Sequence, residues 1–102
     1  MNEFKELTGV IRAFADKREW EKFHTPKNLS MAVAGEAGEL VAEFQWLTEA
    51  ESKLSALSAE KLSDIEMEVA DVAIYLLRLA DVLEFDLPAA VRKKMEINES
   101  RF

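Results

Sequence analysis

The chain has 102 residues, of which 49% are hydrophobic, three are glycine and two are proline. A chain of this length forms one small domain, residues 1–102, and its scarcity of turn residues favours an all-α fold over a turn-rich β fold. Its 13 basic and 20 acidic residues give a formal charge of −7, which excludes a typical duplex nucleic-acid binder because phosphate contacts need a basic face.

The first predicted helix covers residues 3–22, and a connector at residues 23–28 follows it. Apolar residues recur in this helix at the spacing of one helical face, with charged residues between them. Within the connector, Thr25 precedes Pro26, an order typical of a helix N-cap followed by proline at the first helical position. A second helix is therefore expected from about Lys27 to Leu47.

Two features of the second predicted helix indicate a site. Glu36 falls within its apolar stripe, where a soluble helix normally buries Leu or Val, and Glu39 lies on the flank of that stripe. Gly35 and Gly38 surround Glu36, although each glycine weakens a helix by up to about 1 kcal/mol relative to alanine. Their presence indicates that another group approaches this backbone closely.

A polar connector separates the second helix from the third. The capping-box sequence Thr48–Glu51 predicts a short surface helix through Leu57. Ser58 is then the expected N-cap of a third helix, residues 59–84. A polar ridge follows one flank of its apolar stripe and consists of Asp64, Glu68, Asp71 and Tyr75.

The final predicted helix covers residues 89–99. Asp86 is its expected cap, and Pro88 is tolerated near the first turn. Positive charge gathers in this part of the chain, and spacings of four and three residues place Lys94, Asn98 and Arg101 on one helical face. Two interpretations remain open for these residues, namely a phosphate-binding face and basic residues that complement the helix dipole.

The two carboxylate pairs, Glu36 with Glu39 and Glu68 with Asp71, carry the strongest functional signal. The members of each pair are three residues apart and are therefore neighbours on one helix face. Four converging carboxylates would repel one another and retain protons unless a cation neutralised them. Mg²⁺ prefers oxygen ligands, whereas a chain with no cysteine and one histidine disfavours zinc or iron. We therefore predict a magnesium site, with solvated helix charges as the alternative.

Aromatic residues form a second candidate group. Trp20 and Trp46 are expected to flank a base by stacking, with Tyr75 adding a polar group. His24, the single histidine, lies in the connector near Pro26 and is a further candidate to face a nucleotide. The alternative is structural, since a tryptophan at helical spacing commonly packs in a core and a histidine in a loop commonly packs or caps.

Four motifs in this order resemble the dCTP pyrophosphatase branch of the MazG-like, all-α nucleoside triphosphate pyrophosphohydrolases. The paired acidic residues are similar to the metal signature of that family. The motifs read WEKFHTPKNL at 20–29, GEAGEL at 35–40, FQW at 44–46 and KMEIN at 94–98. The likeness extends from Trp20 to Arg101.

The resemblance implies a helical protomer that forms a homodimer or homotetramer, with antiparallel helices pooled into four-helix-bundle-like cores. It also implies Mg²⁺-dependent hydrolysis of a nucleoside triphosphate, dCTP being favoured, to the monophosphate and pyrophosphate. Transferred residue by residue, it assigns the metal to Glu36, Glu39, Glu68 and Asp71. It assigns the base and sugar to Trp20, His24, Trp46 and Tyr75, and the phosphates to Lys94, Asn98 and Arg101.

The expected mechanism is in-line attack by a water whose pKa is lowered by Mg²⁺, with Glu39 orienting that water or accepting its proton. Two other classes of function remain open, namely a nucleotide-binding module that does not hydrolyse and a purely structural helical dimer. The charged N-terminus lacks a signal-peptide core, and no apolar run reaches the ~20 residues that span a bilayer. We therefore expect a soluble cytoplasmic protein, which also suits the lack of cysteine.

Overall fold

The computed structural model describes residues 2–102, so residue 1 of the predicted domain lies outside the described residues. Within this range the chain forms helices and no β-strand, which confirms the all-α class. Four are α-helices and one is a short 3₁₀ helix. Their bounds are α1 Glu3–Lys17, α2 Pro26–Phe44, η1 Leu54–Ala56, α3 Ala59–Val82 and α4 Leu87–Arg101.

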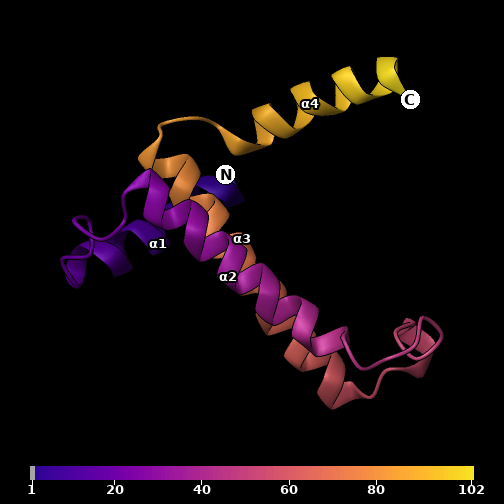
Figure 1. The fold of residues 1–102 in the computed structure, drawn as a ribbon. Helices are drawn as coiled ribbons and strands as arrows, with labels where there is room; N and C mark the ends of the chain where they lie inside the picture. Colours follow the sequence, from indigo (N-terminus) through magenta and orange to yellow (C-terminus); the bar gives the residue numbers. More distant parts are fainter. Residues whose placement is uncertain (1) are drawn as a thin grey trace.

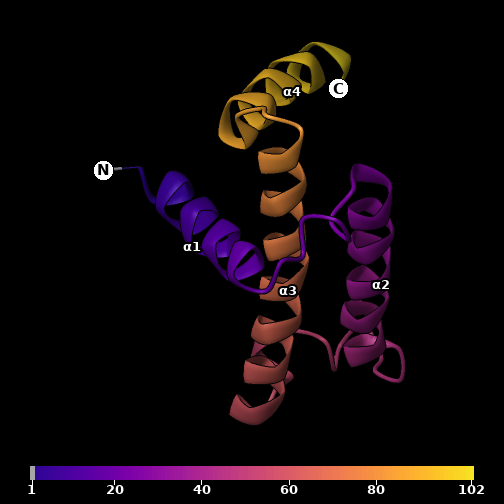
Figure 2. The ribbon, with the colours of Figure 1, turned by 90° about the vertical axis from the view of Figure 1, so that its left-hand side faces the viewer.

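The antiparallel pair α2 and α3 forms the centre of the molecule (Figure 1). Turned by 90°, the same ribbon shows α1 crossing α3 and α4 leaving the far end of α3 to point away from the pair (Figure 2). None of the helices in residues 2–102 combines the length and the apolar character that crossing a membrane requires. The contact between α2 and α3 is the most extensive between any two helices of residues 2–102.

The protomer buries few apolar side chains. The buried hydrophobic residues are Ala15, Leu29, Ile65, Leu77 and Ala80, of which Leu29 is 1% exposed. Large apolar side chains remain exposed along α1 and α3, among them Phe4, Leu7, Phe14, Met67, Ile74 and Leu76. The apolar faces that the sequence pattern predicted are thus present, but within one protomer many of them have no covering element.

The helix starts agree with the predicted caps. The side chain of Thr25 accepts a hydrogen bond from the backbone N–H of Asn28 at 3.2 Å, and Pro26 is the first residue of α2. Ser58 caps α3 and Asp86 caps α4 in the same way, each at 3.0 Å. These side chains satisfy backbone donors that a helix N-terminus leaves unpaired.

The predicted helix ends were wrong by two to five residues. The first helix stops at Lys17 instead of 22, because Glu19 adopts a left-handed conformation (φ 57°) and the N–H of Trp20 turns back to the carbonyl of Ala15 at 3.0 Å. The third helix stops at Val82 instead of 84, with Glu84 left-handed in the same manner (φ 58°). Such closures usually use glycine, so neither stop had its usual sequence signal. The second helix ends at Phe44 instead of 47, and α4 extends to both sides of the predicted 89–99.

The capping box predicted at residues 48–57 forms, but it opens a turn and not an α-helix. The N–H of Thr48 donates to Glu51 Oε1 at 2.8 Å, and the N–H of Glu51 donates to Thr48 Oγ1 at 3.2 Å. The only helical segment in this connector is the 3₁₀ turn η1. The reciprocal side-chain bonds are therefore sufficient to form a tight turn. No apolar stripe follows them, so nothing extends this turn into an α-helix.

Candidate metal and nucleotide site

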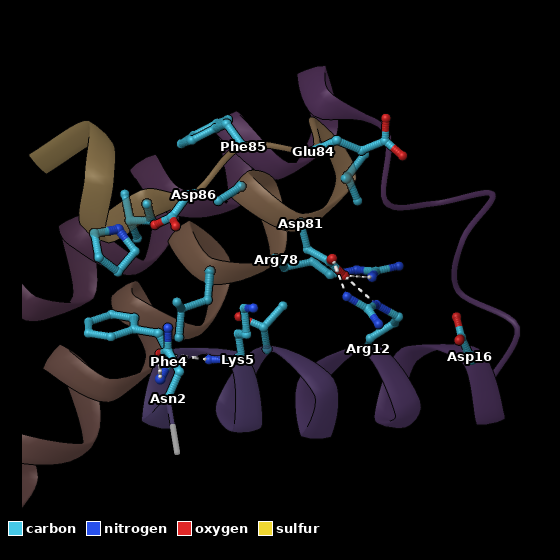
Figure 3. A pocket seen from close by; sticks show the side chains of 16 residues that line it. Asn2, Phe4, Lys5, Arg12, Asp16, Arg78, Asp81, Glu84, Phe85 and Asp86 are labelled. Atoms are coloured by element: carbon cyan, nitrogen blue, oxygen red, sulfur yellow. Dashed lines mark hydrogen bonds and ion pairs between the residues drawn. The ribbon is translucent and has the colours of Figure 1, made fainter.

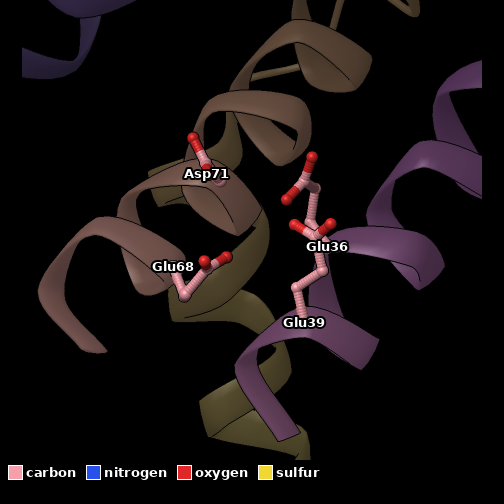
Figure 4. Close-up of side chains that lie close together, drawn as sticks. All are labelled: Glu36, Glu39, Glu68 and Asp71. Atoms are coloured by element: carbon pink, nitrogen blue, oxygen red, sulfur yellow. The ribbon is translucent and has the colours of Figure 1, made fainter. Parts of the chain in front are cut away.

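Four carboxylates meet on the facing sides of α2 and α3. Glu36 and Glu39 come from α2, and Glu68 and Asp71 come from α3 (Figure 4). One carboxylate oxygen of each residue lies within 4.8 Å of the other three. Glu39 is exposed, and the other three side chains are half-buried. The three-residue spacing on each helix makes each pair contiguous, and antiparallel packing then joins the two pairs.

The cluster lacks any neutralising side chain. Atom Oε2 of Glu36 and atom Oε2 of Glu68 are buried and have no hydrogen-bond partner. The ion pairs within residues 2–102 join Arg12 to Asp81, Lys61 to Glu43 and Arg78 to Asp81, so no cationic side chain contacts the four carboxylates. Buried carboxylate oxygens without partners are costly, since an uncompensated charge loses its hydration.

The crowding of these carboxylates raises the pKa of two of them, Glu68 and Glu36. The pKa of Glu68 is raised, first by burial and then by the negative charges of Glu39 and Asp71. The pKa of Glu36 is raised, first because Glu39 would accept a hydrogen bond from its protonated form and then by burial. A set of hard oxygen ligands that retains protons when empty fits a divalent cation such as Mg²⁺.

The glycines beside Glu36 do not face another part of the protomer. Apart from the adjacent residues and the backbone of its own helix turns, a Cβ placed on Gly35 or on Gly38 would have no atom within 4 Å. The close approach expected from these glycines is therefore not made by any described segment of the same chain. The backbone of α2 at this point is open to a molecule from outside.

Trp20, His24 and Tyr75 lie toward one end of the α2–α3 pair. The rings of Trp20 and His24 pack edge to face with centroids 5.8 Å apart. Nδ1 of His24 accepts a hydrogen bond from Nε of Arg78 on α3 at 3.0 Å. Tyr75 lies between Asp71 and Arg78 along α3 and therefore on the path from the carboxylates to the imidazole.

Trp46 lies at the other end of α2. The 19 residues of α2 separate it from His24, which at 1.5 Å per residue is about 28 Å. Its side chain is 87% exposed. The expectation that Trp20 and Trp46 flank one base therefore does not hold within a single protomer, because helix α2 holds them apart.

The predicted phosphate-binding residues are also remote from the cluster in one protomer. Lys94, Asn98 and Arg101 all belong to α4, which points away from the α2–α3 pair in both ribbon views (Figures 1 and 2). The described residues of one protomer do not bring them to the cluster, and their predicted role stays a prediction.

A cavity of about 750 Å³ lies between α1, the end of α3 and the start of α4 (Figure 3). Arg12, Arg78 and Asp81 are among its lining residues, and none of the four clustered carboxylates lines it. Shape alone would direct attention to this cavity. The cluster of carboxylates between α2 and α3, with its two buried oxygens that lack hydrogen-bond partners, is instead the candidate metal site.

The sequence interpretation did not anticipate Arg78. The available signal was a lone cation within the apolar run Ile74–Leu79 of a predicted core helix. A charged residue at a buried position is rare unless it is paired, so this pattern indicates that Arg78 has a partner. In the structure Arg78 contacts His24, which is 54 residues away in the sequence, and Asp81, which lies on the next turn of α3.

Comparison with known proteins gives one consistent set of relatives. No protein-family model matches the chain. Over 98 residues, 96% of its length, the chain is 45% identical to dCTP pyrophosphatase 1 of Homo sapiens and 44% identical to that of Rattus norvegicus. It spans 58% of the length of these relatives. The crystal structure of a pyrophosphatase from Archaeoglobus fulgidus superposes with a TM-score of 0.91 at 40% identity, covering 100% of this chain and 94% of that one.

Proposed function

The chain belongs to the MazG-like all-α nucleoside triphosphate pyrophosphohydrolases, and we propose that it hydrolyses a deoxynucleoside triphosphate, with dCTP preferred, in a Mg²⁺-dependent reaction. Water attacks the α-phosphorus, the bond to the bridging oxygen of the β-phosphate breaks, and the products are the monophosphate and pyrophosphate. The preference for dCTP follows the relatives named dCTP pyrophosphatase, of which this chain spans 58%.

The observation that carries this proposal is the cluster of four carboxylates within 4.8 Å, two of which have buried oxygens without partners. Such a cluster repels a bare triphosphate and needs a cation to be compatible with it. When bound, Mg²⁺ would neutralise phosphoryl charge and lower the pKa of a water molecule. Glu36, Glu39, Glu68 and Asp71 would hold it.

The carboxylates differ in what else they offer the reaction. Glu36 and Glu68 present their buried oxygens at the seam between α2 and α3, which suits them to holding a cation. Glu39 is the exposed member and can face a water molecule as well. We assign to Glu39 the orientation of the attacking water and the acceptance of its proton.

We propose that the working unit is a homodimer or a larger homo-oligomer. The exposed apolar faces of α1 and α3 are the surfaces that a second copy would cover to build a four-helix-bundle-like core. A second copy would also account for Trp46 and for Lys94, Asn98 and Arg101, which lie away from the cluster of their own protomer. In this arrangement Trp20, His24 and Tyr75 contact the base and sugar from one protomer.

The test is a panel of dNTPs and NTPs incubated with Mg²⁺, with products separated by anion-exchange chromatography and identified by ³¹P NMR. We expect monophosphate and pyrophosphate, with the largest kcat/KM for dCTP, and no turnover in excess EDTA. Diphosphate and inorganic phosphate as products would contradict the assigned bond cleavage. Nucleotide binding without any product would instead favour a non-hydrolytic binding module.

A further inference from the structure

A buried arginine joins three segments of the chain near one end of the α2–α3 pair. Within residues 2–102, Arg78 is the only buried charged residue, with 5% of its surface exposed. Its Nε–H donates to Nδ1 of His24 at 3.0 Å, and its Nη1 donates to Oδ2 of Asp81 at 3.2 Å. Arg12 of α1 donates two more hydrogen bonds to Asp81, at 2.8 and 2.6 Å (Figure 3). The guanidinium of Arg78 is thereby held between a carboxylate and an imidazole.

The bond from Arg78 determines which nitrogen of His24 carries the proton. A guanidinium offers only donors and stays protonated, so Nδ1 must accept and the neutral imidazole carries its proton on Nε2. Nε2 has no hydrogen-bond partner among the described residues, since the bond to Arg78 is the one that the imidazole makes. The ring is also packed edge-on against Trp20. His24 thus presents one oriented N–H donor.

Burial and the charge of Arg78 favour the neutral form of the His24 imidazole. Burial lowers its pKa first, and the positive charge of Arg78 lowers it further. Glu21 of the connector acts in the opposite direction with a smaller effect. Arg78 from α3 and Glu21 from the connector are the charged groups that act on the ring, and Asp81 lies beyond the guanidinium. The lowered pKa therefore favours the neutral ring.

His24 contacts α3 through Arg78, and the position of Arg78 on that helix relates the imidazole to the carboxylates. Arg78 follows Asp71 by seven residues, which is two turns of α3, about 10 Å along the axis and nearly on the same face. Tyr75 occupies the turn between them. A nucleotide whose phosphates lie at the carboxylates would extend its sugar and base along this face toward the imidazole.

We propose that Arg78 is a positioning residue, which locks His24 as the Nε2–H tautomer so that this N–H donates to an acceptor atom on the nucleoside part of the substrate. The inference rests on the proposed function for the identity of the ligand. The lock itself depends only on the contacts of Arg78 with His24 and Asp81. Without it, the imidazole would divide between two tautomers and would present Nε2 as an acceptor part of the time.

The first test is NMR of the imidazole nitrogens, which is unambiguous because His24 is the only histidine. In the wild-type protein between pH 7 and 8 we expect a protonated Nε2 and a hydrogen-bonded, unprotonated Nδ1. Arg78→Met should give a mixture of tautomers and a higher midpoint of titration. Arg12→Met is the matched control, because Arg12 contacts Asp81 without touching His24, and it should keep the wild-type tautomer.

The second test separates positioning from folding by kinetics. Arg78→Met should raise KM for dCTP by about three- to tenfold, the value of one hydrogen bond, with kcat within about twofold. In a His24→Phe background the same substitution should add nothing, because the two residues act through one bond. Arg78→Lys retains a cation and a donor and should restore most of the loss.

Several results would overturn the proposal. An Nδ1–H tautomer in the wild-type protein refutes it even if Arg78→Met does not fold. An unchanged tautomer in folded Arg78→Met refutes the lock, and an equal rise in KM in the His24→Phe background refutes action through His24. If the wild-type protein hydrolyses no nucleoside triphosphate, the proposed function fails and the substrate contact fails with it, while the NMR result still decides whether Arg78 sets the tautomer.

Discussion

Replacing Glu68 with glutamine should make the cation-free protein more stable while it removes activity. The pKa of Glu68 is raised in the folded state by burial and by the charges of Glu39 and Asp71. A folded protein that holds this proton more tightly than the unfolded chain has its full stability below the unfolded pKa, and it loses stability as pH rises through the folded pKa. The loss therefore begins above about pH 4.5. Glutamine cannot ionise, so the variant avoids it.

The size of the effect follows from the number of charges and from cation binding. Four charged carboxylates make six like-charge pairs, and removing one charge leaves three. In the wild-type protein, a cation present at 100 times its Kd should contribute about 2.7 kcal/mol, which raises Tm by about 10 to 20 °C in a domain of this size. Glu68→Gln should lose most of this gain, together with at least about 100-fold in kcat/KM.

Thermal unfolding at fixed protein concentration, followed from pH 5 to pH 8 in EDTA and in Mg²⁺, measures both effects. Glu66→Gln is the matched control, because Glu66 is an exposed residue of the same helix outside the cluster, and it should behave as wild type. The reasoning is refuted if Glu68→Gln melts below wild type in EDTA at pH 7.5. It is also refuted if the variant retains the full stabilisation by Mg²⁺.

Three other substitutions test separate parts of the account. Asp71→Asn should lower pyrophosphate release by at least about 100-fold, whereas Asp64→Asn, on the same polar ridge but outside the cluster, should stay near wild type; equal losses would contradict the assignment of the cluster. Leu29→Ala should lower the free energy of unfolding in urea by about 2 to 5 kcal/mol, since Leu29 is 1% exposed, and a change below about 1 kcal/mol would show that the core lies elsewhere. Trp46→Ala should raise KM for dCTP and leave kcat nearly unchanged; an unchanged KM would remove Trp46 from the nucleoside pocket.

The sequence predicted helix starts better than helix ends, for a physical reason. A start is fixed by a side chain such as Thr25 or Ser58, whose oxygen accepts from a backbone N–H three residues later, so the signal is local and chemical. The ends of α1 and α3 use Glu19 and Glu84 in a left-handed conformation. Packing after the turn selects that conformation, as when Trp20 folds back onto Phe14 with ring centroids 5.6 Å apart.

The carboxylate cluster was predictable because each pair needs only helical spacing and the two helices need only to face each other. The residues proposed to contact the nucleoside were harder to group from the sequence. Trp20 and Trp46 were grouped by residue type, yet the length of α2 separates them, and no one-dimensional pattern reveals which copy of a chain supplies a side chain. Arg78 was missed because its partner His24 is 54 residues away in the sequence.

The most direct test of the account is a crystal soaked in Mn²⁺ with a slowly hydrolysed dCTP analogue, with data collected at the manganese absorption edge. The account predicts an anomalous peak bounded by oxygens of Glu36, Glu39, Glu68 and Asp71, and nucleotide phosphate density beside it. An ordered analogue bound elsewhere, with no anomalous peak among these four carboxylates, would contradict it.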